Sequence, residues 1–113
     1  MLVAFSFRAK PGREQELEAL LSNADAGRAV AKGLGATRNM LFWRDGRMVR
    51  VLEFPAGAPR RTMTDLARDD PRMAEFLGKL APLIEDGFDP KDLGSLDAFN
   101  QRMGLRLLYD VRT

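Results

Sequence analysis

The chain has 113 residues, a formal net charge of +2 and a pI near 9.4, and it contains neither Cys nor His. Their absence excludes disulfides, zinc or haem held by those residues, and Ser-His-Asp or Cys-His catalysis. The length predicts one domain spanning residues 1–113. No base-reading motif accompanies its basic residues, so we expect no binding to nucleic acid. No run approaches the ~20 apolar residues of a membrane span and no signal peptide is evident, so we expect a cytoplasmic protein that does not bind a membrane.

The N-terminal third predicts a strand and then a helix. Residues 2–7 alternate a bulky side (Val3, Phe5, Phe7) with a smaller one, which is typical of a central strand. Lys10-Pro11-Gly12 ends it. Apolar residues then follow helical spacing at Leu17, Leu20, Leu21 and Ala24. Residues 22–36 are rich in Ala and Gly, and we expect them to be irregular with at most one short helical turn.

The segment 38–54 predicts a β-hairpin. Two apolar runs meet at Asp45-Gly46, the dipeptide that best tolerates a type I′ turn. A two-residue loop fixes the register, so that Trp43 faces Met48 and Leu41 faces Arg50. Arg38 then faces Glu53 as a pair of opposite charges across the ladder.

The hairpin has two faces with different expected roles. We expect one to pack on the helices: Met40, Phe42, Val49 and Val51. The other face is apolar with an amide and a guanidinium in its middle: Asn39, Leu41, Trp43, Met48, Arg50, Leu52 and Phe54. We expect this second face to point away from the helices and to carry the site.

The segment 55–94 predicts two helices. Pro55, Gly57 and Pro59 end the hairpin, and Thr62 or Thr64 can cap a short helix. Asp70-Pro71 starts the second helix as N-cap and first helical residue. An apolar stripe follows and predicts core contacts: Met73, Phe76, Leu77, Leu80 and Ile84. Pro82 should end or bend this helix.

The C-terminal segment predicts a helix and a last strand. Ser95 is a candidate cap for a short helix that bears Leu96, Phe99 and Met103 and that Gly104 would close. Beyond it, apolar residues alternate with other residues: Leu105, Leu107, Tyr109 and Val111. The alternation favours a strand, and a continued helix is the alternative.

The order of elements predicts an α+β, ferredoxin-like βαββαβ fold with an antiparallel sheet and helices on one face. An uncovered Trp43 face would expose too much apolar surface on a monomer. We therefore expect a homodimer whose two sheets pack face to face as a dimeric α/β barrel and enclose the pocket.

The sequence resembles the SchA/CurD-like proteins of aromatic polyketide and spore-pigment biosynthesis, within the dimeric α/β-barrel group. The matching residues lie in the hairpin and beyond: Phe42, Arg44-Asp45, Met48-Val49-Arg50-Val51, Glu53, Pro71, Leu80-Ala81-Pro82, Asp92 and Phe99. The first strand with Lys10-Pro11-Gly12 is also similar to the broader antibiotic-biosynthesis monooxygenase group.

This resemblance implies action on phenol-rich polyketide intermediates. One interpretation is a cofactor-independent, quinone-forming monooxygenase acting on anthrone or naphthol-type substrates. A polyketide cyclase or aromatase is the second, and a non-catalytic polyketide-binding partner of the type II synthase is the third. Monooxygenase relatives place an Asn and a Trp four residues apart on one strand, the spacing of Asn39 and Trp43 here.

Three residues are candidates for catalysis without a cofactor or metal. A guanidinium at Arg50 would stabilise a substrate oxyanion, Asn39 would donate a second hydrogen bond, and Trp43 would stack on the ring. The candidate substrate-binding residues are Trp43, Met48, Leu41, Leu52, Phe54 and Tyr109, the last offering a phenol for proton transfer. The alternatives are an ion-pair role for Arg50, an interface anchor at Trp43 and backbone satisfaction by Asn39.

Overall fold

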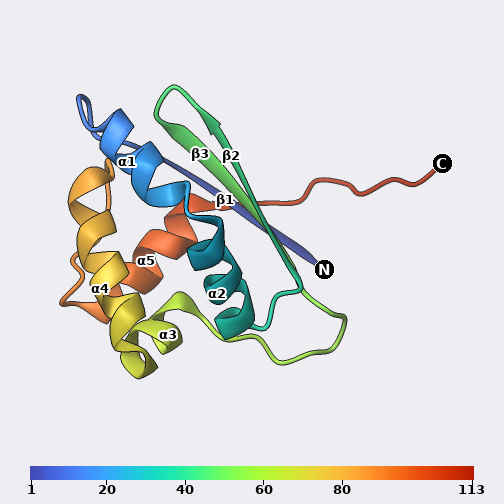
Figure 1. Ribbon diagram of the computed structural model, residues 1–113. Coiled ribbons are helices and arrows are strands. Elements are labelled where there is room, and N and C mark those ends of the chain that lie inside the picture. The colour runs from blue at the N-terminus through green and yellow to red at the C-terminus, as the bar shows by residue number, and fades with distance from the viewer.

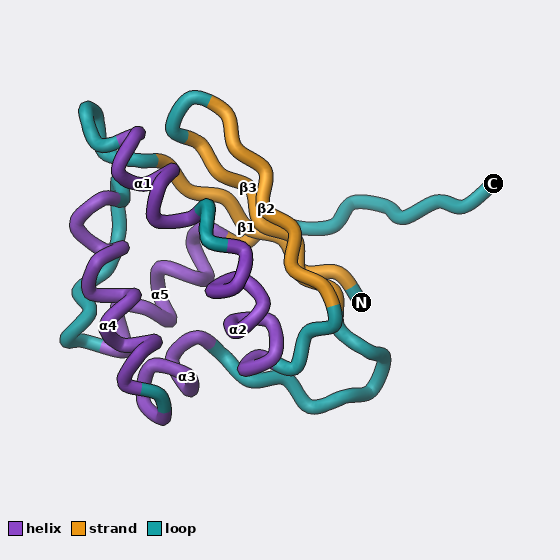
Figure 2. Tube along the Cα trace, in the orientation of Figure 1, coloured by secondary structure: helices purple, strands orange, loops and turns teal.

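The computed structural model describes residues 1–113 as a four-stranded antiparallel sheet with five α-helices on one of its faces (Figures 1 and 2). The strands are β1 (Leu2–Arg8), β2 (Arg38–Arg44), β3 (Arg47–Glu53) and β4 (Gly104–Leu105). The helices are α1 (Glu14–Leu21), α2 (Ala24–Leu34), α3 (Met63–Asp69), α4 (Pro71–Leu80), the 3₁₀ turn η1 (Ala81–Leu83) and α5 (Leu93–Met103). The strand order β2-β3-β1-β4 is compatible with the ferredoxin-like fold, so the predicted α+β class is confirmed.

The predicted hairpin register is confirmed. Asp45 and Gly46 have φ of 49° and 86°, the two positive values that a type I′ turn requires. Trp43 therefore faces Met48, and Leu41 faces Arg50. β1 lies between β3 and β4, so it is an interior strand of the sheet, as predicted.

The prediction of which hairpin face meets the helices is wrong. Phe42 is 58% exposed on the open face, whereas Met48 is fully buried. The register of β1 explains the outcome, because its bulky side lies beside the Met48 face: Phe7 pairs with Met48, Phe5 with Arg50 and Val3 with Leu52. The face that carries Asn39, Trp43 and Arg50 is consequently the covered one, and any site on it lies inside one chain rather than between two sheets.

Residues expected to be irregular form helix α2. Asn23 caps it by accepting a hydrogen bond from Ala26 N at 3.1 Å, and Gly35 ends it with a φ of 84°. The small residues serve close packing: a Cβ at Gly33 would lie 2.9 Å from the Leu66 methyl groups. The small side chains of α2 therefore allow this helix to pack closely against α3.

Caps in the second half are partly as predicted. Thr62 and Asp65 form a reciprocal capping box at α3, and Asp70 caps α4 ahead of Pro71. Helix α4 ends at Leu80, before the 3₁₀ turn that contains Pro82. At α5 the cap is Asp92 rather than Ser95, because the Asp92 carboxylate accepts from Gly94 N at 3.1 Å. Gly104 is extended, with a φ of −62°, and not left-handed.

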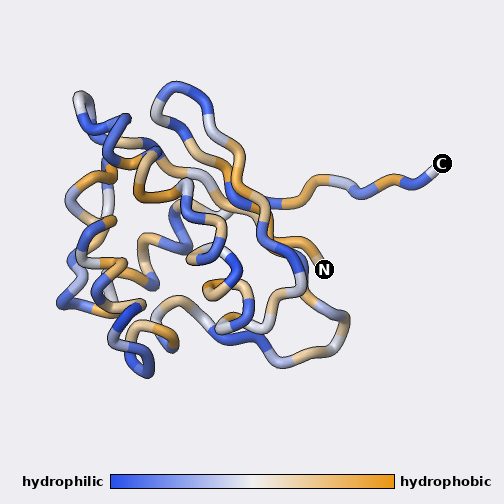
Figure 3. The backbone as a smooth tube through the Cα atoms, in the orientation of Figure 1, coloured by the Kyte–Doolittle hydropathy of each residue, from blue (hydrophilic) through white to orange (hydrophobic).

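The C-terminal strand is much shorter than predicted. β4 contains only Gly104 and Leu105, paired with Phe5 and Ala4, and the chain then runs away from the body as an extended tail (Figure 1). Figure 3 shows apolar and polar residues interspersed along this tail. Its apolar residues are all exposed: Leu107, Leu108, Tyr109 and Val111. The longest helices have 11 residues, and none combines the length and hydropathy that a membrane span needs.

Candidate functional site

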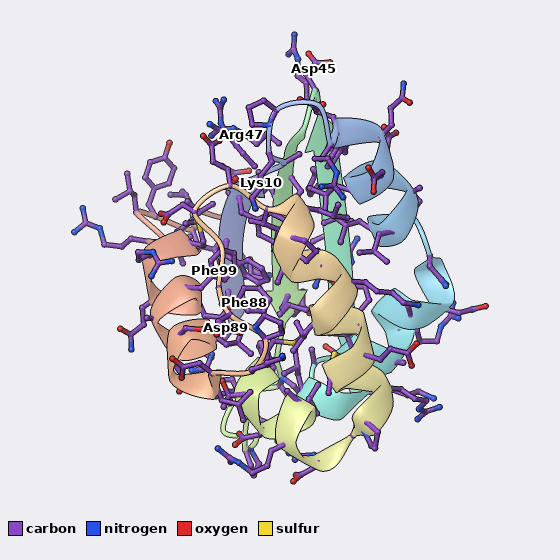
Figure 4. The ribbon with its side chains drawn as sticks, turned by 90° about the vertical axis from the view of Figure 1, so that its left-hand side faces the viewer. Lys10, Asp45, Arg47, Phe88, Asp89 and Phe99 are labelled. Atoms are coloured by element: carbon purple, nitrogen blue, oxygen red, sulfur yellow. The ribbon has the colours of Figure 1, made fainter.

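A cavity of about 640 Å³ lies between the hairpin and helices α1 and α2, and we name it the β2/α2 cavity. Four of the predicted site residues line it: Asn39, Leu41, Trp43 and Arg50. Alternation along β2 and β3 points these side chains to one face, and the turn at Asp45-Gly46 sets them side by side. Asp45 projects from the hairpin tip, outside this cavity (Figure 4).

Arg50 is a cation on the covered face of the sheet. Its side chain is partly buried, and its Nε atom is fully buried without a hydrogen-bond partner. No carboxylate forms a salt bridge with it, and its guanidinium carbon lies 5.8 Å from the centroid of the Phe5 ring. Burial lowers the pKa of Arg50, but a guanidinium is basic enough to stay protonated at neutral pH. The site therefore holds a positive charge that lacks a protein counter-ion.

Asn39 is oriented by helix α2. Its Nδ2 atom donates to the Gly27 carbonyl at 2.9 Å, which fixes the side of the amide that faces the helix. Its Oδ1 atom is buried without a partner. The unpartnered group of this amide is therefore an acceptor, whereas the sequence had suggested a donor.

Trp43 and Leu41 form the apolar wall of the same cavity. Both are partly buried, and both pack against the main core while still lining the cavity. An indole at such a position offers a flat apolar surface to an aromatic ring. The cavity thus combines the partly buried cation of Arg50, two exposed arginines (Arg28 and Arg38), an amide acceptor and an apolar wall.

Two further cavities meet at Arg50. One of about 350 Å³, the β1/α5 cavity, is lined by Arg50 together with Leu52 and Phe54. The other, of about 260 Å³, is the α2/α4 cavity, which Arg50 shares with residues such as Met73 and Phe76. The guanidinium consequently stands where three hollow regions between the sheet and the helices converge.

Two predicted binding residues do not reach these cavities. Met48 has no exposed surface and belongs to the core. Tyr109 is 79% exposed on the tail, and Figure 1 shows that tail leading away from the helices. Neither residue can contact a ligand held within this chain's cavities.

Sequence reasoning missed one carboxylate. Glu18 is the only acidic residue that lines the β2/α2 cavity, and it forms no ion pair. Its i, i+3 spacing to Leu21, which lines the same cavity, was the available signal. Glu18 is a candidate proton acceptor at the cavity.

An aromatic cluster fixes α5 against the sheet. The Phe99 ring centroid lies 5.2 Å from that of Phe88 and 5.7 Å from that of Phe7 (Figure 4). Phe7 and Phe99 are buried, and none of the three rings lines the cavities that meet at Arg50. This cluster is therefore part of the support for the site.

Comparison with known proteins identifies a family. The SchA/CurD-like domain matches residues 1–112, which is nearly the whole chain. Searches of curated proteins and of solved structures gave no match. The hairpin residues on which the sequence resemblance depended lie inside the matched range. The chain belongs to the SchA/CurD-like family, which is associated with polyketide biosynthesis.

Proposed function

We propose that this protein is a cofactor-independent, quinone-forming monooxygenase that oxidises anthrone or naphthol-type polyketide intermediates held in the β2/α2 cavity. The observation that carries the proposal is Arg50, a positive charge with a buried, unpartnered Nε atom and no acidic neighbour in a salt bridge. A protein gains little from such a group unless a ligand supplies the missing negative charge.

The substrate's own oxyanion supplies that charge. An anthrone becomes reactive toward dioxygen when it loses a proton and forms an electron-rich enolate. Arg50 stabilises this anion more strongly than the neutral substrate, and the surrounding low-dielectric cavity strengthens the interaction. The substrate's pKa falls as a result, without a histidine base.

The overall reaction needs no other redox partner. The substrate CH₂ group loses four electrons to dioxygen and becomes the quinone carbonyl. One oxygen atom of dioxygen ends in that carbonyl, and the other leaves as water with the two hydrogens of the CH₂ group. Glu18 acts as the general base that accepts the proton lost from the CH₂ group when the enolate forms.

Asn39 and Trp43 orient the substrate for this step. The free Oδ1 atom of Asn39 accepts a hydrogen bond from a phenol O–H of the substrate. The Trp43 indole stacks on the fused rings and keeps water from the reacting carbon. Holding the rings between these two residues directs the enolate oxygen to Arg50.

A polyketide cyclase is the second candidate. Three cavities that converge on Arg50 give room for a folded poly-β-ketone chain, whose enolate the same guanidinium would stabilise. A cyclase closes a ring and consumes no oxygen. A protein that only binds the polyketide for the synthase would show neither activity.

Oxygen uptake tests these alternatives. Metal-free protein is mixed with an anthrone, and oxygen consumption and quinone formation are followed for the wild type, Arg50→Ala and Trp43→Ala. Arg47→Ala is the matched control, because Arg47 lies on the same strand but lines none of the three cavities. We expect turnover to fall by about 10²-fold or more in Arg50→Ala and to persist in the control. An unchanged rate in Arg50→Ala would contradict the oxyanion role, and ring closure without oxygen would select the cyclase.

We also propose a homodimer, formed through the open face of the sheet and the tail. Large apolar side chains are exposed on that side: Leu2, Phe42, Leu105, Leu107, Leu108, Tyr109 and Val111. The tail has strand-like alternation but no strand to pair with in its own chain, and a second copy offers one. Mass measurement in solution tests this: we expect a dimer that deletion of residues 106–113 or Phe42→Lys converts to a monomer. A wild-type monomer would contradict the proposal.

A further inference from the structure

The α2/α4 cavity differs from the β2/α2 cavity because its own charged groups already have partners. Besides Arg50, its lining contains one acid and one base, Asp70 and Arg72, and these two form an ion pair with 3.5 Å between Arg72 Nε and Asp70 Oδ1. The Asn23 side chain accepts the hydrogen bond from Ala26 N that caps α2. A charged ligand group would therefore find no free counter-ion in this cavity other than Arg50.

The remaining wall of the α2/α4 cavity is mostly apolar. Helix α2 contributes small residues such as Ala26 and Ala29, and helices α3 and α4 contribute the larger Leu66, Met73 and Phe76. Such a wall favours an apolar group, because moving that group out of water is favourable. An engineered apolar cavity of ~150 Å³ binds benzene, so the 260 Å³ of this cavity have room for an alkyl chain of about five carbons.

The α2/α4 cavity adjoins the β2/α2 cavity, which holds the substrate in the proposed function. Four residues line both cavities: Leu21, Asn23, Gly27 and Arg50. Gly27 leaves space at this junction, because a Cβ there would have one neighbour within 4 Å outside the backbone of its own helix, Asn39 Nδ2 at 3.6 Å. A ligand whose oxyanion lies at Arg50 can therefore extend past Gly27 from one cavity into the other.

From this arrangement we infer that the substrate carries an uncharged alkyl side chain close to its oxyanion, and that the α2/α4 cavity binds this chain. The fused rings stay in the β2/α2 cavity with Asn39 and Trp43, and the oxyanion lies at Arg50, as in the proposed function. The chain passes Gly27 and lies against the small residues of α2. This inference rests on the proposed function, because the anion at Arg50 determines which part of the ligand reaches the α2/α4 cavity.

The test uses hydroxyquinones, which are anions at neutral pH and bind without being oxidised. The dissociation constants of 2-hydroxy-1,4-naphthoquinone and of its 3-pentyl derivative, whose chain lies beside the oxyanion, are measured for the wild type, Ala26→Leu and Ala29→Leu. Both substitutions add volume at the α2/α4 cavity and leave the lining of the β2/α2 cavity unchanged. Ala74→Leu is the matched control, because Ala74 is exposed on α4 and lines none of the three cavities. We expect the wild type to bind the pentyl compound about ten-fold more tightly, which is less than complete burial would give, since each fully buried CH₂ is worth about four-fold in affinity.

The preference for the pentyl chain and the affinity for the unsubstituted anion report on different cavities. The inference predicts that Ala26→Leu and Ala29→Leu lose most of the preference and keep the wild-type affinity for the unsubstituted compound, while Ala74→Leu retains both. Equal affinities for the two compounds in the wild type, or a preference that persists in both α2 variants, would overturn the inference and leave the role of Arg50 intact. If the wild type binds neither compound, or if Arg50→Ala binds the unsubstituted anion as tightly as the wild type does, the proposed function fails and the inference fails with it.

Discussion

Replacing Arg50 by methionine should make the protein more stable and less active. The Nε–H group of Arg50 is buried without an acceptor, and burial lowers the pKa of the guanidinium because the charge is poorly solvated. Methionine has a similar length and needs no hydrogen bond. The substitution therefore removes an unsatisfied donor and an uncompensated charge while it largely fills the same space.

The expected gain in stability follows from two opposing contributions. A buried unsatisfied donor costs about 1–3 kcal/mol, which the substitution recovers. The contact between Arg50 and the Phe5 ring is worth about 1–2 kcal/mol, and a methionine sulfur beside the same ring returns roughly 0.3–1.5 kcal/mol of it. The balance is a free energy of unfolding higher by about 1 kcal/mol, or about 4 °C in Tm for a domain of this length.

Thermal denaturation and oxygen uptake measure the two effects separately. We expect Arg50→Met to melt at or above the wild-type temperature in the absence of substrate, with turnover reduced by about 10²–10³-fold. Arg47→Met, on the same strand but outside the cavities, should change neither quantity strongly. A Tm several degrees below the wild type would refute the reasoning, because it would mean that Arg50 already has a stabilising partner in the free protein.

Three further predictions concern proton transfer, a helix cap and the hairpin turn. If Glu18 accepts the substrate proton, Glu18→Gln should lower oxygen uptake most below the pH at which the anthrone ionises by itself, and a rise in pH should restore the rate. The backbone N–H of Thr62 holds the pKa of Asp65 below its ordinary value, so Asp65→Asn should lower Tm at neutral pH, and the difference should vanish as the pH falls through that lowered pKa. Thr62→Ala removes the cap on the Asp65 N–H and should cost about 1 kcal/mol at neutral pH. Gly46→Ala should reduce the urea midpoint by the equivalent of about 1 kcal/mol or more, because φ is 86° and the new Cβ would lie 2.8 Å from Glu14 Cγ.

Local signals predicted the hairpin and most of the caps. Asp45-Gly46 determined a type I′ turn, and the turn alone determined every pairing between β2 and β3. Thr62 and Asp70 were identified from short patterns that depend on neighbours three or four residues away. Such features are predictable because their interactions are close in sequence.

Features that depend on distant contacts were not predicted. Helix α2 is poor in large apolar residues because it packs closely, with Gly33 against Leu66, and a low-volume sequence resembles a loop. The alternating tail after Leu105 looks like a strand, but nothing in its own chain pairs with it. In both cases the deciding contact lies far away in the sequence or outside the chain.

The misassigned hairpin face and the location of the site have one physical cause. Arg50 and Asn39 suggested a face that points away from the helices toward a pocket between two subunits, because a charge or an amide is costly in a closely packed core. In the structure neither residue is in a closely packed core, because both line a cavity. Each still has one buried atom that lacks a protein partner. Polar residues on the bulky side of a covered sheet are thus a signal for an internal cavity. The β1 pattern of Val3, Phe5 and Phe7 shows which side is covered, so the two strands together contain the information that the hairpin alone does not.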